Sequence, residues 1–149
     1  MKNPGKINFA ILFVATFVCL TSLPSVAGEI VQARKQRFKQ SGAALQLMSK
    51  QLAPAEDFEA LKLKANELIE WANEMPGYFP PGSDTPDDEA KPNVFTDPEG
   101  FQSAAQNFAN AAQMIEDAAK NGDIAAVKAA IGRTGASCKA CHKKYRAKK

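Results

Sequence analysis

The chain has little histidine and little cysteine. Its 149 residues contain one histidine, His142, and three cysteines. A structural zinc site takes about four such ligands. Only Cys138, Cys141 and His142 lie together, because Cys19 belongs to the N-terminal apolar stretch, so a site near the C-terminus would be one ligand short. It also shows no acid and base pair of the kind used in hydrolysis or group transfer, and we therefore do not expect an enzyme.

An apolar run long enough to span a membrane is also missing. The most apolar stretch, residues 7–20, is shorter than the roughly 20 residues that a spanning helix needs. It follows two lysines and precedes Ser25 and Ala27, which have the small side chains that signal peptidase accepts. We expect residues 1–27 to be a cleaved signal peptide and residues 28–149 to be one exported domain in the periplasm, with no membrane attachment.

A large excess of positive charge is absent from the expected mature chain. Cleavage removes Lys2 and Lys6, which reduces the 19 basic residues to 17, against 16 acidic ones. Proteins that bind nucleic acid are usually far more basic, so we expect no nucleic-acid partner. Cleavage also removes Cys19 and leaves Cys138 and Cys141, and a disulfide between these two would constrain the unfolded chain little.

The alternation of apolar and polar residues that is typical of strands is absent as well. Apolar residues instead recur three or four positions apart, which predicts helices. Pro54 and Pro98 suit the first turns of the second and third helices. Thr96 or Asp97 is expected to cap the third helix, and Asp123 the fourth. The four predicted helices cover residues 31–52, 54–75, 98–119 and 124–145.

One connection is much longer than the others. Residues 76–98 hold most of the prolines and a cluster of acids, which is typical of a loop. Four helices with two short connections and one long one indicate an all-α fold, an antiparallel four-helix bundle whose long connection joins the second and third helices.

The last predicted helix carries the motif CKACH, residues 138–142. The pattern CxxCH is the attachment signature of c-type haem. Cys138 and Cys141 would form thioethers with the cofactor, and His142 would supply the proximal iron ligand. We therefore expect one covalently bound haem c per chain, and the export signal agrees with attachment outside the cytoplasm.

Two alternatives to an open haem site remain. A sixth iron ligand from a methionine (Met48, Met75 or Met114) or from a lysine would give a low-spin, six-coordinate electron carrier. A haem-free thiol or metal module is the other alternative. A redox CxxC pair is expected at a helix N-terminus, whereas this pair lies late in its helix, where the helix dipole disfavours a thiolate.

Two segments resemble the cytochrome c′ family. The first is GASCKACHKKYR close to the C-terminus, in which Arg146 follows His142 by four residues. The second is ARKQRFKQ in the first predicted helix, in which Arg34 and Phe38 are four residues apart. The resemblance extends over the whole expected mature chain, 28–149, and it implies a haem-binding four-helix bundle.

The resemblance also implies roles for individual residues. Arg34 would neutralise a haem propionate, and Phe38 would cover the distal face, where it cannot coordinate iron. Arg146 would lie on the proximal side, and Lys91 is a candidate for a propionate contact. Simpler roles are open for these residues: a core aromatic for Phe38, a helix C-terminal cation for Arg146 and a solvated loop lysine for Lys91.

The expected function follows from these roles. The resemblance implies a five-coordinate, high-spin haem that binds small gases, nitric oxide and carbon monoxide, and that transfers electrons to a redox partner protein that the sequence does not identify. An apolar distal side offers bound dioxygen no hydrogen bond. The family resemblance further implies a homodimer formed through the first two helices.

Overall fold

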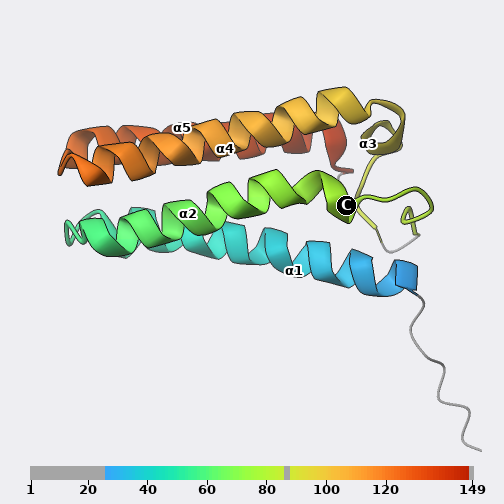
Figure 1. Ribbon diagram of the computed structural model, residues 1–149, viewed down its shortest axis with the longest axis horizontal. Coiled ribbons are helices and arrows are strands. Elements are labelled where there is room, and N and C mark those ends of the chain that lie inside the picture. Colours follow the sequence, from blue (N-terminus) through green and yellow to red (C-terminus); the bar gives the residue numbers. More distant parts are fainter. Residues whose placement is uncertain (1–25, 86–87, 148–149) are drawn as a thin grey trace, which may run out of the picture.

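The computed structural model describes residues 26–85 and 88–147; most of the expected signal peptide lies outside them. Four long helices form an antiparallel bundle, which confirms the predicted fold class (Figure 1). No helix in the described ranges is long and apolar enough to cross a membrane. The helical elements are α1 (Val26–Leu47), η1 (Met48–Leu52, a π-helical turn), α2 (Phe58–Glu74), η2 (Met75–Tyr78, a 3₁₀ turn), α3 (Asn93–Thr96), α4 (Pro98–Lys120) and α5 (Ile124–Tyr145).

The starts of three helices are fixed by aspartate caps. Asp97 accepts a hydrogen bond from the Gly100 N–H and Asp123 from the Ala126 N–H, as predicted for α4 and α5. The prediction for α2 was wrong: this helix starts at Phe58, after the cap Asp57, and not near Pro54. Asp57 fixes the start of the helix because its side-chain oxygen accepts a hydrogen bond from the Ala60 N–H, which would otherwise have no partner.

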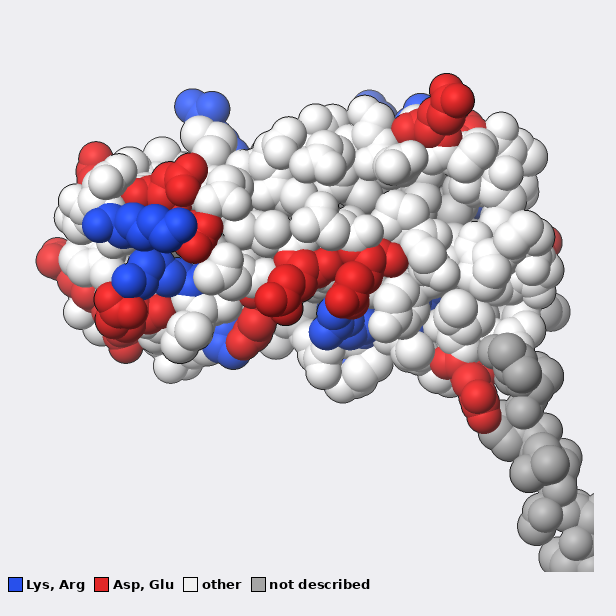
Figure 2. All heavy atoms as spheres, in the orientation of Figure 1, with Lys and Arg blue, Asp and Glu red and all other residues white. Residues whose placement is uncertain are grey.

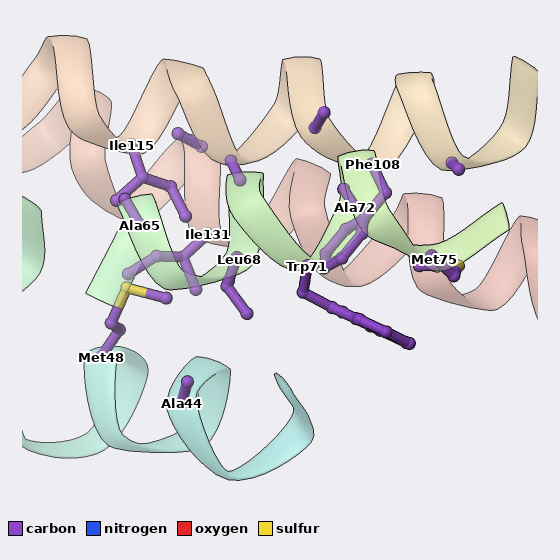
Figure 3. Close-up of a cluster of buried hydrophobic side chains, with 14 of the residues drawn as sticks. Ala44, Met48, Ala65, Leu68, Trp71, Ala72, Met75, Phe108, Ile115 and Ile131 are labelled. Carbon is purple, nitrogen blue, oxygen red and sulfur yellow. The ribbon is translucent and has the colours of Figure 1, made fainter. Parts of the chain in front are cut away.

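The apolar core fills the bundle along its length. Met48 from η1 lies beside Ala65, Leu68 and Ile131, deep between the helices (Figure 3). Met75 is also buried, whereas Met114, the third methionine considered above as an iron ligand, is 42% exposed on the surface. Met114 precedes Ile115, which is fully buried on α4, so the neighbouring position faces outward.

The long connection is tied to α1 by one buried arginine. Arg34 is 1% exposed, and its Nη1 donates to the Tyr78 carbonyl (3.0 Å) and to Ser83 Oγ (2.9 Å). Its Nη2 donates to the Ser83 carbonyl (2.7 Å) and forms an ion pair with Asp88. The guanidinium also stacks over the ring of Phe79, 4.4 Å from the ring centroid. A buried charge needs such partners, and here all of them come from residues 78–88.

We predict that Asp88→Ala destabilises the protein by about 3 kcal/mol, because it leaves the Arg34 charge buried without its counterion. The double variant Arg34→Met/Asp88→Ala should be less destabilised than the single one, since no uncompensated charge remains. Denaturant unfolding measures both values.

The control for this prediction is Glu74→Ala, which breaks the exposed ion pair of Glu74 with Arg37. Pairs of this kind contribute about 0–1 kcal/mol. If Asp88→Ala lowers the free energy of unfolding no more than Glu74→Ala does, the Arg34 cluster does not hold the connection in place.

Candidate cofactor site

A cavity of about 710 Å³ lies between α1 and α5. Such a volume is within the range of roughly 300–1,000 Å³ found for cofactor and ligand sites. Its walls come from α1, α4, α5 and the long connection, and most of its lining is apolar or aromatic. The residues predicted for the site that line it are Arg34, Phe38, Cys138, Cys141, His142 and Arg146.

The two cysteines lie one turn apart on the cavity side of α5, because their spacing of three residues puts them on one helix face. Both are half-buried, and they are not joined in a disulfide. Burial, with a smaller contribution from Cys138, raises the pKa of the Cys141 thiol to about 11, and burial also raises the pKa of Cys138. These thiols are therefore protonated and unsuited to redox exchange at neutral pH.

The imidazole of His142 also faces the cavity. Its ring centroid is 6.4 Å from that of Phe38, which comes from α1 on the opposite wall. Burial lowers the pKa of His142, the charge of Arg146 lowers it further, and Glu89 opposes this effect. The imidazole is thus neutral at pH 7, the form that binds metal ions.

Phe38 belongs to an aromatic cluster that restricts its movement. Its ring packs edge-on against Trp71 at a centroid distance of 5.2 Å and is tilted against Phe79 at 6.4 Å. Tyr78 in turn packs edge-on against Trp71 at 5.1 Å. Phe38 is therefore both a packing residue and part of the cavity wall.

Arg146 is held by a residue that the sequence analysis did not identify. Its Nε and Nη2 donate to Glu89 Oε2, at 2.6 and 2.5 Å. The backbone reinforces the contact, because Ala90 and Arg146 form an isolated antiparallel bridge and the Ala147 N–H donates to the Glu89 carbonyl. Glu89 and Asp88 both line the cavity. The sequence shows them only as part of a cluster of acids in the long connection, and it does not indicate which arginine each one binds.

Lys91 lies outside the cavity lining. Its Nζ donates to the Lys143 carbonyl (2.9 Å), and the Asn93 side chain donates to the Lys144 carbonyl (3.0 Å). Both side chains therefore satisfy carbonyls at the end of α5, which have no partner within the helix. A propionate contact of Lys91 stays a prediction.

Among the three methionines in the described ranges, only Met75 lines the cavity. Met48 lies in the core (Figure 3) and Met114 on the surface. The lysines that line the cavity are Lys35, Lys39 and Lys139.

The residues present fit a covalently held haem. The cavity has the required size, and both thiols and the neutral imidazole lie on one wall. Arg34 Nε is buried and has no hydrogen-bond partner among the described residues. An orphaned cationic donor of this kind suits an anionic acceptor such as a haem propionate.

Comparisons with known proteins agree with this reading of the site. A family model described as Cytochrome C' matches residues 29–146. Cytochrome c-556 from Agrobacterium tumefaciens is 37% identical over 126 residues, which cover 83% of this chain and 100% of that protein. Cytochrome c' from Rubrivivax gelatinosus is 48% identical over 71 residues, 47% of this chain and 55% of that protein, so this match spans about half of the relative.

Solved structures give the same result. The crystal structure of cytochrome c' from Rubrivivax gelatinosus has a TM-score of 0.69 at 31% identity and covers 80% of this chain and 96% of that one. A variant of cytochrome c prime from Alcaligenes xylosoxidans has a TM-score of 0.73 at 27% identity, with coverage of 83% and 97%. The chain therefore belongs to the cytochrome c′ family, whose cofactor is covalently bound haem c.

Proposed function

We propose that this protein is an exported cytochrome with a five-coordinate, high-spin haem that binds small gases and exchanges electrons. The observation that carries the proposal is Phe38, which lies opposite His142 across the cavity and has no atom that can coordinate iron. When bound, the haem supplies an iron that cycles between ferric and ferrous and takes a gas at its open position.

The protein's own residues hold and shield the cofactor. Cys138 and Cys141 would form the thioethers that hold the haem, and His142 would bind its iron. Arg34 Nε would donate to a propionate while the other nitrogens of Arg34 hold the connection. Arg146 lies on the same side as His142, next to Glu89, and its charge disfavours protonation of the imidazole.

Relatives support the choice of ligand. The solved structures include variants of cytochrome c prime from Alcaligenes xylosoxidans in complex with nitric oxide and with carbon monoxide. In this chain the aromatic distal wall offers no hydrogen bond to a polar ligand. Nitric oxide and carbon monoxide depend on such a bond less than dioxygen does, so the wall favours these two gases.

The cellular setting is part of the proposal. Residues 1–27 are removed on export, and residues 28–149 form the periplasmic haem domain. A homodimer through α1 and α2 is implied by the family; a groove of about 620 Å³, lined by residues of both helices, lies at the surface where the partner would bind. Sedimentation equilibrium of the mature protein tests the dimer.

A low-spin electron carrier is the second candidate, because Met75 and three lysines line the cavity. A haem-free module is less well supported. Within the described ranges no cluster of three or more His, Cys, Asp or Glu side chains is placed to bind a metal, and burial raises rather than lowers the thiol pKa values.

The absorption spectrum of the mature protein, produced with cytochrome c maturation machinery, tests the proposal. We expect a broad, unsplit band in the reduced form that shifts when carbon monoxide is added, because the sixth position is open. A sharp, split band that does not shift when carbon monoxide is added would establish the low-spin carrier instead. A colourless protein would exclude haem.

A second prediction concerns Phe38. We expect Phe38→Ala to raise the rate of carbon monoxide association by roughly tenfold, which corresponds to a barrier lower by about 1.4 kcal/mol, because the ring crowds the open side of the cavity. Flash photolysis of the carbon monoxide complex measures the rate.

Phe58→Ala is the matched control, since Phe58 packs on the core at the start of α2 and does not line the cavity. Both variants lose stability, by up to about 3–5 kcal/mol. If Phe38→Ala binds carbon monoxide no faster than Phe58→Ala, Phe38 does not limit ligand entry.

A further inference from the structure

The charges of the four long helices are divided between two sides of the bundle. The helix α5 carries five lysines or arginines and no aspartate or glutamate, and α1 carries four against one. The helices α2 and α4 have the opposite balance, with two basic against four acidic residues and one against three. The face on which α2 and α4 lie in front has a band of acidic side chains across its middle (Figure 2).

The cofactor cavity lies on the basic side, between α1 and α5. The acids in its lining, Asp88 and Glu89, are both engaged by arginines, Arg34 and Arg146. The lysines in its lining come from α1 and α5 and are Lys35, Lys39 and Lys139. The wall of the cavity therefore carries a net positive charge that its own carboxylates do not neutralise.

Three of the nearby lysines are available to a partner. The side chains of Lys39, Lys139 and Lys143 are exposed, and within the described residues none of them is in an ion pair. Lys139 and Lys143 are one turn apart on α5, and Lys39 comes from the other wall of the cavity. Together these residues, called here the lysine rim, are positioned to attract an anionic surface toward the cofactor.

We propose that the lysine rim is the docking surface for a redox protein that presents a cluster of carboxylates. This inference rests on the proposed electron exchange, and it names the chemistry of the partner. Electrostatic attraction of a partner toward one face depends on an uneven charge distribution rather than on net charge. A chain with nearly equal numbers of acids and bases can therefore still attract an acidic partner.

A protein partner suits the surface better than a membrane or a second copy of the chain. Peripheral binding to membranes is usually reinforced by apolar side chains that insert at the interface. The exposed large apolar residues in the described ranges, Leu63 and Met114, belong to α2 and α4 instead. A second copy docking by the same face would bring two basic surfaces together, which electrostatic repulsion disfavours.

Two oxidants of opposite charge test the electrostatics on the reduced holoprotein. In each reaction one electron passes to the reagent, ferricyanide or tris(phenanthroline)cobalt(III), and no bond forms or breaks. We expect the rate with ferricyanide to fall as salt is added and the rate with the cobalt complex to rise, since salt screens both interactions. We expect the double variant Lys39→Glu/Lys139→Glu to lower the rate of the reaction with ferricyanide by roughly tenfold or more.

Lys120→Glu is the control, because Lys120 ends α4 on the acidic side and its charge reversal is of the same kind. Rates that change equally in the control and in the single variant Lys139→Glu would overturn the proposal. This readout needs only a redox-active haem, so it is valid even if carbon monoxide does not bind and the gas-binding function fails.

Binding to two macromolecular probes identifies the class of partner. We expect poly-L-glutamate to bind the holoprotein at low salt, to slow its reaction with ferricyanide and to lose affinity in the double variant. Vesicles of phosphatidylglycerol and phosphatidylcholine should bind more weakly. Tighter binding to the vesicles would assign the surface to membranes. Self-association at low salt that the double variant Lys39→Glu/Lys139→Glu abolishes would assign it to a second copy, as distinct from a dimer through α1 and α2; either result overturns the proposal.

Discussion

The buried ion pair of Arg34 with Asp88 is the contact on which closure of the cofactor cavity depends. A guanidinium that is 1% exposed is stable only if its charge is compensated, and every partner of Arg34 lies in residues 78–88. The long connection, which has little regular structure of its own, is thereby fixed against α1. Its aromatic residue Phe79 is held between Arg34 and Phe38, so the same contact shapes the wall opposite His142.

The next residue along the chain extends this arrangement to the opposite wall. Asp88 binds an arginine of α1, and Glu89 binds Arg146 just after α5. Two consecutive carboxylates thus connect the helices on either side of the cavity. The backbone bridge between Ala90 and Arg146 continues the connection past the last turn of α5, the turn that holds His142. A segment predicted only as a loop therefore positions both sides of the site.

The sequence was sufficient for features that depend on local patterns. Helical periodicity gave the four helices, and CxxCH with its histidine gave the cofactor, because each signal is contained within a few turns of chain. Contacts between distant residues could not be predicted in this way. Nothing local links Asp88 to Arg34, 54 residues away, or Glu89 to Arg146, 57 residues away. The late start of α2 was missed for a different reason, since both Pro54 and Asp57 are good start signals and only the fold selects between them.

The helix α5 combines two tasks that could have been placed on different elements. It carries the two cysteines and the histidine, and it contains no acidic residue between Ile124 and Tyr145. The cations in its last turn are favourable next to the negative end of the helix dipole, so the basic character costs little stability. If Cys138 and Cys141 attach the cofactor to this helix as proposed, any charge on the helix stays close to the iron. Attachment and the proposed attraction of an anionic partner would then be linked, because the element that holds the haem would also carry the charges that attract the partner.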